Sequence, residues 1–418
     1  MRTIKRMNTL VKPFSALRPK TEHASTLIAP PYDVVNEEEV RALISESPNS
    51  FLCVSRPETG FPIGTNPNSE AIHAKAKENL ERLKSHGLLV REDTPAYYVY
   101  KMKMGSHEQT GIALTASVDA YNDNIVKKHE FTRPTKEDDR TQNMLSLNAQ
   151  TGPVLSVYRN NKSLKNLLSD IEKNTPLFEV KGQYEVIHTI WRIEDAMTIN
   201  MITSIFEEMQ NIYIADGHHR SAAAARVSNE LRISNTSSRE SFDYFLTVVF
   251  PQDEMQIFDY NRVIRDLNGL SPTQVLNLLS KDFNIEAADK PIKPNEPGMF
   301  GMFLANQWYR LVLNAHLLPT DNPVALLDVS LLQDRILSPV LNVGDPRTDP
   351  RLDFVGGVRG LKELENLVRS GKYSAAFSLY PTTMEQLMAV ADAGEIMPPK
   401  STWFEPKLGD GLLSHVLD

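Results

Sequence analysis

The spacing of apolar residues along the chain predicts a mixture of helices and strands. Over residues 70–86 apolar residues recur every three to four positions, which is typical of a helix with one buried face. Over 96–104 and 111–119 apolar and polar residues alternate, which is typical of two strands joined as a hairpin through 105–107. We therefore expect an α/β fold (mixed α+β) with mixed sheets and flanking helices.

The same two patterns recur through the rest of the chain. An acidic first turn after Asn36 predicts a helix over residues 36–46. The two kinds of element do not alternate strictly, so the pattern does not predict a purely parallel sheet. The other predicted helices span 136–148, 161–172, 196–208, 218–234, 323–338, 359–370 and 381–392, and the other predicted strands span 153–158, 183–193, 210–215, 242–250, 307–314, 351–355 and 374–379.

One segment has the composition of a linker. Residues 286–298 contain three prolines and a glycine among polar residues, a combination that disfavours helices and central strands. We therefore expect a linker region over 269–298. It would separate an N-terminal and core α/β domain, residues 1–268, from a C-terminal α/β domain, residues 299–418.

Composition and charge exclude several classes of protein. The 418 residues are 41% hydrophobic and 23% charged, as in ordinary globular proteins. The 45 basic residues face 53 acidic ones, and the net charge of −8 argues against nucleic acid as a partner, because each phosphate contact requires a cation. The single cysteine, Cys53, allows no internal disulfide, and we expect it to be buried. No run of 18 apolar residues predicts a membrane span, so we expect a cytoplasmic protein.

The segment that carries most chemistry is 212–226, in which an apolar strand leads through Gly217 into an alanine-rich helix. Unpaired N–H groups at the start of that helix, beside His218, His219 and Arg220, would make a cradle for an anion such as phosphate. Asp216 could hold a histidine or bind Mg²⁺. The alternative is that Asp216 only caps the helix and that both histidines are surface residues.

Two further segments present charged side chains. Ten of the fourteen residues in 127–140 can carry charge, and Glu130, Lys136 and Arg140 are candidates for contact with a nucleotide or its acceptor. The alternative there is a solvated loop. Three prolines stiffen 397–411, which presents Lys400, Ser401 and Lys407. We expect Trp403 and Phe404 of that segment to pack against the core.

Taken together, these segments resemble the bacterial and archaeal family known as domain of unknown function 1015. The turn at 216–220 is also similar to the phosphate-binding turn of the ParB and sulfiredoxin-like superfamily, and Gly217, His219 and Arg220 match its motif. This second resemblance implies a ParB/sulfiredoxin-like nucleotide-binding core with large insertions. That superfamily includes kinases of free serine. The segments that resemble the first family are 14–19, 29–34, 129–140, 214–220, 397–402 and 406–407.

Our first hypothesis is a nucleotide-dependent phosphotransferase that uses ATP or ADP (or CTP) with Mg²⁺ and acts on a small polar metabolite such as free serine or a related amino acid. The alternative is a non-catalytic nucleotide- or metabolite-binding regulatory protein, which could be associated with nucleic acid. The oligomeric state stays open. In the first hypothesis Glu130, Asp216, His218 and His219 are catalytic, Asp216 binds the metal, and the nucleotide contacts Gly217, His219, Arg220, Lys136, Arg140, Lys400, Ser401 and Lys407.

We expect these residues to share one cleft whose floor is the turn at 216–220. Within it, Lys400 or Lys407 and at least one of Glu130, Lys136 and Arg140 would lie within side-chain reach of the turn. One of the acidic residues 37–39 could replace Glu130 as the base. Arg220→Ala is expected to abolish nucleotide or phosphate binding with little effect on folding, because we expect Arg220 to be partly exposed and such an arginine contributes little stability.

Overall fold

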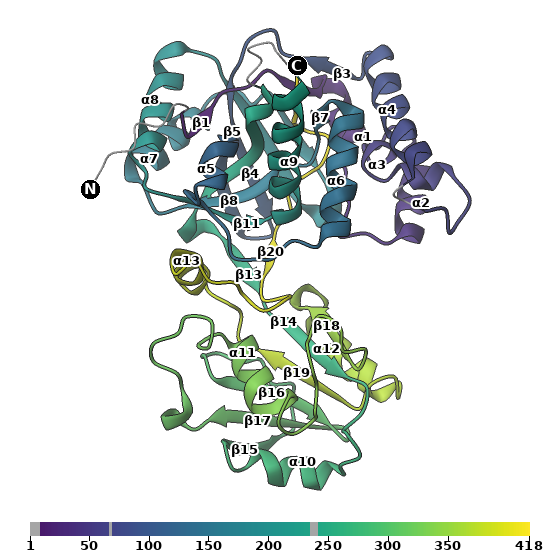
Figure 1. The fold of residues 1–418 in the computed structure, drawn as a ribbon, viewed down its shortest axis with the longest axis vertical. Coiled ribbons are helices and arrows are strands. Elements are labelled where there is room, and N and C mark those ends of the chain that lie inside the picture. Colours follow the sequence, from purple (N-terminus) through teal and green to yellow (C-terminus); the bar gives the residue numbers. More distant parts are fainter. Residues whose placement is uncertain (1–8, 67–68, 235–240) are drawn as a thin grey trace. The chain divides into compact units, whose positions relative to one another are not determined.

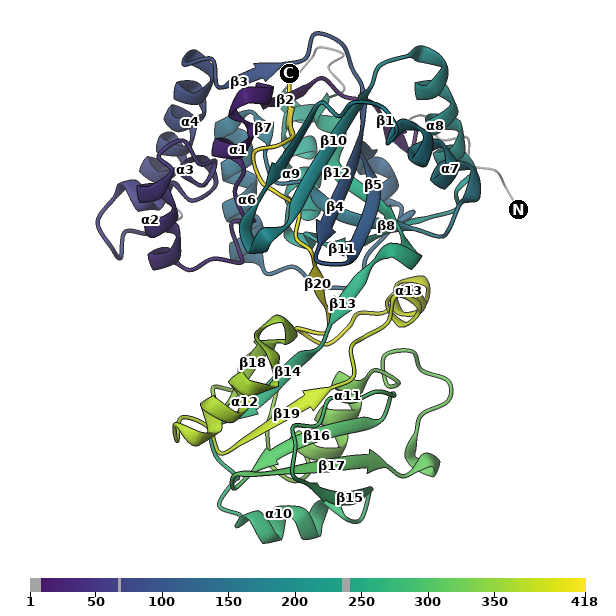
Figure 2. The same cartoon turned by 180° about the vertical axis from the view of Figure 1, so that it is seen from behind.

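The computed structural model describes residues 9–66, 69–234 and 241–418, which form two compact units (Figures 1 and 2). Unit 1 comprises the described residues up to Met255 together with Pro406–Asp418, and unit 2 comprises Gln256–Glu405. Both units contain helices and strands, so the predicted mixed α/β fold class is confirmed.

The division between the units differs from the predicted domains 1–268 and 299–418, because the last segment of the chain returns to unit 1. The predicted linker 269–298 contains helix α10 (Pro272–Leu279) and strand β15 (Phe283–Ala288) of unit 2. β15 is the edge strand of its sheet, and most of its side chains are exposed or half-buried. Its polar sequence is therefore that of an edge strand with one solvated side.

Unit 1 is built on a large mixed sheet. Its central strands are almost entirely buried, as in β8 and β12, which pair in parallel. The strand order is β6 (Val126–Lys127), β11 (Ile212–Asp216), β8 (Val154–Tyr158), β12 (Tyr244–Pro251), β5 (His107–Ser117), β4 (Tyr97–Met104), β10 (Ile187–Ile193) and β9 (Phe178–Lys181), and β1 (Val11–Lys12) also pairs with β5.

Helix α9 (His218–Ser234) packs on this sheet beside α6 (Pro134–Leu147), as Figure 1 shows. The buried side chains of Ala223, Ala224 and Ala225 are small, so α9 can approach both the strands and α6 closely. The short helix α5 (Val118–Asn122) also contacts α9. The predicted helices over 136–148 and 218–234 are thus confirmed and lie side by side.

A smaller sheet of unit 1 brings distant parts of the chain together. Its strand order is β3 (Leu89–Arg91), β2 (Ala16–Pro19), β21 (Ser414–Val416) and β7 (Ala149–Gln150). A separate backbone bridge joins Ala29 to Asp410, with two N–H···O bonds of 2.8 and 3.0 Å. The C-terminal segment is thereby fixed against two N-terminal segments.

The remaining helices of unit 1 lie at its periphery. Asn36 and Glu39 form a reciprocal capping box at the start of α2, which confirms the helix predicted over 36–46. Cys53 is buried, as predicted. These helices are α1 (Ala24–Leu27), α2 (Glu37–Glu46), α3 (Leu52–Ser55), α4 (Glu70–Ser85), α7 (Lys162–Ile171) and α8 (Ala196–Glu208).

Unit 2 contains a six-stranded sheet with its own apolar cluster, which includes Val263, Phe303 and Trp308. The strand order is β15, β17 (Gln307–Leu313), β16 (Met299–Leu304), β19 (Ala375–Leu379), β14 (Tyr260–Ile264) and β18 (Leu352–Gly356), while β13 (Gln256–Phe258) pairs with β20 (Trp403–Glu405). Besides α10, its helices are α11 (Asp328–Leu332), α12 (Gly360–Arg369) and α13 (Met384–Asp392).

None of the helices in the described residues has both the length and the apolar surface needed to span a membrane.

Candidate functional site

The candidate site begins where strand β11 ends and helix α9 starts. Gly217 joins them with a backbone φ of +98°, a conformation that residues with a Cβ rarely adopt. The N–H groups of Arg220 and Ser221 both bond to the Gly217 carbonyl, so the helix starts immediately after the glycine. The first N–H groups of a helix such as α9 have no acceptor within the helix, and they lie at the positive end of its dipole.

Arg220 lies beneath this turn and is only 7% exposed. One of its Nη atoms donates to the carbonyl of Pro153, and the other lies 3.9 Å from the carboxylate of Asp216. Burial opposes the charge of Arg220, but Asp33, Asp216 and other acidic groups around it raise its pKa above the usual value. This burial corrects the expectation that Arg220 is partly exposed, because its guanidinium faces the Pro153 carbonyl and the Asp216 carboxylate.

Asp216 connects the turn to the C-terminal segment of unit 1. Its Oδ2 lies 3.1 Å from Nζ of Lys407, and both side chains are partly shielded from solvent. Burial would raise the pKa of Asp216, but Lys407 and Arg220 hold it well below its usual value. Asp216 is therefore an ionised carboxylate with two cationic neighbours.

The segment after strand β6 meets the same turn. β6 and β11 are parallel neighbours in register, with Val126 opposite Ile212, so the residues that follow them emerge at one edge of the sheet. The N–H of His129 donates to Nε2 of His218 at 3.5 Å, and Oε2 of Glu130 lies 3.5 Å from Nδ1 of His218. The imidazoles of His129 and His218 pack edge to face with their centroids 4.4 Å apart.

His219 faces the start of helix α6. Its Nε2 accepts a hydrogen bond of 3.0 Å from the N–H of Arg133. Burial lowers the pKa of His219, and the charges of Arg133 and Lys136 lower it further, whereas Asp33 and Glu137 act in the opposite direction. Arg133 and Lys136 are themselves exposed. An imidazole, exposed cations and a helix N-terminus are therefore close to one another.

The loop at 29–34 supplies residues that sequence reasoning had given no role. The ring of Tyr32 lies 4.1 Å from the guanidinium of Arg140 in a cation–π contact. Burial raises the pKa of Tyr32 to about 12. Asp410 is buried nearby; burial raises its pKa to about 7, although Arg220 acts to lower it. The signal that could have indicated this loop was its stiff Pro30-Pro31 turn followed by an acid.

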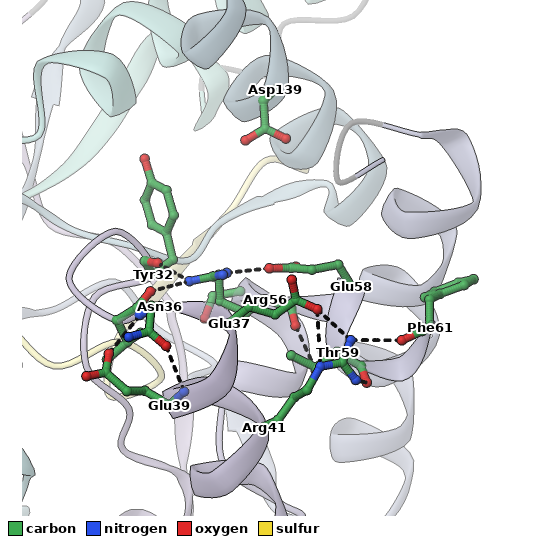
Figure 3. A network of polar contacts seen from close by, with 12 residues as sticks. Tyr32, Asn36, Glu37, Glu39, Arg41, Arg56, Glu58, Thr59, Phe61 and Asp139 are labelled. Atoms are coloured by element: carbon green, nitrogen blue, oxygen red, sulfur yellow. Dashed lines mark hydrogen bonds and ion pairs between the residues drawn. The ribbon is translucent and has the colours of Figure 1, made fainter. Parts of the chain in front are cut away.

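Figure 3 shows how this loop is held and which contacts Glu37 and Glu39 of α2 make. Glu37 forms an ion pair with Arg41, and Glu39 accepts from the N–H of Asn36 in the capping box. Both carboxylates therefore stabilise α2 itself. Arg56 donates to the carbonyl of Tyr32 and to that of Val35, which fixes the loop from below.

The structure does not gather all predicted site residues into one unit. Lys407, Glu130, Lys136 and Arg140 belong to unit 1 with the turn, whereas Lys400 and Ser401 belong to unit 2. There Lys400 lies 5.8 Å from the centre of the Tyr260 ring, and Ser401 Oγ donates to the carbonyl of Pro398. The predicted packing of Trp403 and Phe404 is confirmed within unit 2, where Phe404 is buried and the Trp403 ring lies 5.2 Å from the Tyr260 ring.

Asp216 was also the predicted ligand for Mg²⁺. Within residues 9–66, 69–234 and 241–418, no group of three or more His, Cys, Asp or Glu side chains could hold a metal ion. Because the carboxylate of Asp216 already faces Lys407 and Arg220, it does not fit a metal site held by the protein alone.

The shape of the turn leads to a prediction. A Cβ added at Gly217 would lie 3.0 Å from Nε of Arg220, and the positive φ would remain. Gly217→Ala should lower the free energy of unfolding by about 1–3 kcal/mol. The control is Gly105→Ala in the β4–β5 hairpin, where φ is +60° and no atom lies within 4 Å of the new Cβ. Urea unfolding of both variants tests this, and equal losses would mean that contact with Arg220 contributes nothing.

The fold and site define a class: a mixed α/β protein whose unit 1 joins a glycine turn, buried charged side chains and a histidine pair at one sheet edge. Residues 11–330 match the family described as "Protein of unknown function (DUF1015)", and the chain belongs to that family. The resemblance to domain of unknown function 1015 is therefore confirmed. No curated protein matches the sequence.

Among solved structures, the chain is similar to a conserved hypothetical protein from Pyrococcus furiosus, at 13% identity and a TM-score of 0.34, covering 71% of this chain and 93% of that one. It is similar to a free serine kinase in complex with AMP, at 13% identity and a TM-score of 0.35, covering 72% and 92%. A third similar structure is SbnI with C-terminal truncation from Staphylococcus aureus, at 10% identity and a TM-score of 0.36. The match covers 71% of this chain and 85% of that one. Similarities at this level carry no further conclusion.

Proposed function

We propose that unit 1 is a nucleotide-dependent phosphotransferase, which transfers a terminal phosphoryl group from ATP or ADP to a small polar metabolite such as free serine or a related amino acid. The observation that carries the proposal is the start of α9 behind Gly217, with His219 in its first turn and the exposed cations Arg133 and Lys136 beside it. Phosphoryl transfer depends mainly on positioning and on neutralising charge, and these groups supply both.

The phosphate would bind at the helix start. Backbone N–H groups of the first turn donate to phosphate oxygens without the entropy loss of ordering a side chain. Lys136, in the first turn of α6, adds a mobile cation, and the half-buried imidazole of His219 adds a polar group. Arg220 supports the turn from beneath, so its contribution is to hold the N–H groups in place.

Glu130 would accept the proton of the acceptor. Its side chain is 46% exposed at the same sheet edge, whereas His218 is 3% exposed and cannot meet a substrate directly. In the proposed step, the acceptor hydroxyl loses its proton to the Glu130 carboxylate and its oxygen bonds to the terminal phosphorus. The bond from that phosphorus to the bridging oxygen breaks, and the electron pair leaves with the shorter nucleotide.

Mg²⁺ would reach this site bound to the phosphates of the nucleotide, as is usual for this cation, because the protein offers no donor set of its own in the described residues. When bound there it would neutralise phosphate charge. No step of the proposal depends on Asp216 as a ligand.

The test is a calorimetric titration of the full chain with ATP, ADP and CTP, followed by assays of transfer to serine and related amino acids. Lys136→Ala should weaken nucleotide binding about tenfold, because a hydrogen bond to a charged group is lost. Lys162→Ala, which removes an exposed lysine from the first turn of α7, is the matched control and should bind as the unmodified chain does. If no nucleotide binds at millimolar concentration, the proposal is wrong.

The second candidate is a nucleotide- or metabolite-binding regulatory protein without turnover. One observation favours it. Asp216 forms ion pairs with Lys407 and with the buried Arg220, and these contacts make the turn rigid, as a site that only binds a ligand would need. Nucleotide binding without transfer to any acceptor would favour this candidate over the phosphotransferase.

A further inference from the structure

The imidazole of His218 is buried and lies between two groups of the segment after β6. Its Nε2 accepts the N–H of His129 at 3.5 Å, and its Nδ1 lies 3.5 Å from Oε2 of Glu130. The ring of His129 packs edge to face against it, and the Oγ of Ser221 donates to the His218 carbonyl. The ring is therefore held between His129 and Glu130, and the backbone of His218 is held by Ser221.

These contacts determine where the ring carries its proton. A nitrogen that accepts a backbone N–H has a free lone pair, so Nε2 is unprotonated and the single proton of a neutral ring is on Nδ1. A cationic ring would have a proton on both nitrogens and could not accept from His129. The geometry thus requires a neutral imidazole whose proton is on Nδ1, the nitrogen that lies 3.5 Å from Oε2 of Glu130.

In the described residues Nδ1 of His218 makes no hydrogen bond that meets ordinary distance and angle criteria, although it is buried. The carboxylate of Glu130 lies 3.5 Å from this nitrogen, at the outer limit of hydrogen-bond distance. A buried N–H without a full hydrogen bond costs free energy, and catalytic hydrogen bonds are often long before substrate binds. Closer approach of Glu130 would satisfy this donor.

We propose that His218 is a positioning residue, which holds the carboxylate of Glu130 through Nδ1–H so that the carboxylate can accept the proton of the phosphoryl acceptor. This inference rests on the proposed function. A glutamate side chain loses about 1.5–2 kcal/mol of rotamer entropy when fixed. A rigid donor at the sheet edge would fix the Glu130 side chain before substrate binds, so this entropy would not be lost again in the transfer step. The sequence had placed His218 among the catalytic residues, whereas here it acts through Glu130.

The first experiment needs no activity. The ¹⁵N resonances of the His218 imidazole in the full chain report its tautomer, and we expect Nδ1 protonated and Nε2 unprotonated at pH 7, with no titration down to pH 5. Glu130→Gln should shift the Nδ1 resonance and leave Nε2 unchanged. A ring protonated on Nε2, or one that titrates near pH 6.5, would overturn the proposal. The charged and titratable groups that face this ring are Glu130, His129, Asp216, His219 and Arg220.

The second experiment compares two isosteric variants in the transfer assay. In His218→Asn the amide nitrogen takes the place of Nδ1 and can still donate to Glu130, whereas in His218→Gln the amide reaches the place of Nε2. We expect His218→Gln to lower kcat about 100-fold with little change in nucleotide KM, because Glu130 is misplaced. His218→Asn should restore most of kcat.

Equal losses of kcat in the two variants, with both folded by circular dichroism, would contradict the positioning role. Failure of the proposed function is distinguishable from this outcome. If the chain binds nucleotide but transfers nothing, the tautomer and its response to Glu130→Gln still decide whether His218 holds Glu130. If the tautomer is wrong while transfer occurs, only the positioning role fails.

Discussion

Replacing Arg220 with alanine is expected to lower the free energy of unfolding of unit 1 by about 3–5 kcal/mol, because removing one partner from a buried ionic cluster leaves the other charges uncompensated. The guanidinium is almost fully buried beneath the turn and is surrounded by the carboxylates of Asp33, Asp216 and Asp410. Its loss would also leave the Pro153 carbonyl without this donor and open a cavity below Gly217. The same substitution would therefore weaken any binding at the turn indirectly.

The control for this prediction is Arg226→Ala, two turns further along α9. Arg226 also pairs with carboxylates, those of Asp138 and Glu137, but its side chain is 39% exposed. Its loss should cost no more than about 1 kcal/mol. Urea unfolding at pH 7 measures the free energy of unfolding of both variants and so compares the two losses. Comparable small losses in both would show that Arg220 is not the structural anchor of the turn.

The turn itself could be predicted from sequence because its signals are local. An apolar strand, one glycine and an alanine-rich helix are adjacent in the chain, and each constrains the next. The hairpin of β4 and β5 and the capping box of α2 were predictable for the same reason. In each case the interacting residues lie within a few positions of one another.

The predicted reach of Lys407 and Glu130 to the turn is confirmed, at 3.1 Å from Asp216 and 3.5 Å from His218. The strand pairings that bring them there could not be predicted, because the strands are short and distant in sequence. Strand β6 has two residues, too few for an alternating pattern, yet its parallel pairing with β11 is what brings His129 and Glu130 to the turn. Strand β21 is also short, and it carries the C-terminal segment back to unit 1. A contiguous domain boundary near 269–298 therefore could not describe a chain whose last residues belong to its first unit.

Arg220 shows a different limit of sequence reasoning. An arginine in the first turn of a helix after a glycine is the pattern of a phosphate ligand, and the same pattern also fits an arginine that folds back beneath the turn. What decides between them is the surrounding carboxylates, of which Asp33 and Asp410 come from opposite ends of the chain. Only the tertiary structure places these groups around one side chain.

Acidification from pH 7 to pH 5 is expected to destabilise unit 1. Burial lowers the pKa values of His129, His188 and His415 to about 4 each, and all three are at most 5% exposed. Their pKa in the unfolded chain is about 6.5, so between pH 6.5 and 4 the unfolded chain binds protons that the folded one does not. At pH 5 each imidazole therefore costs about 2 kcal/mol, or about 6 kcal/mol for the three.

Asp410 acts in the opposite direction and provides the test. Its pKa in the folded chain is raised to about 7, so its protonated form stabilises the fold at low pH, and this stability is lost as the pH rises toward 7. Between pH 7 and pH 5 it returns about 2 kcal/mol, which is less than the three imidazoles lose together. Asp410→Asn removes the titrating carboxyl, and with it the stability that is gained on acidification.

Urea unfolding at pH 7 and pH 5 should therefore show a loss of stability in Asp410→Asn that is about 2 kcal/mol larger than in the unmodified chain. Unit 2 serves as an internal comparison, because its one histidine, His316, is exposed and burial raises the pKa of Asp328 to about 7. Its unfolding transition should not weaken over the same range. An identical pH dependence in the two chains would mean that Asp410 is already ionised at pH 5, which would require Arg220 to outweigh the effect of burial on that carboxyl.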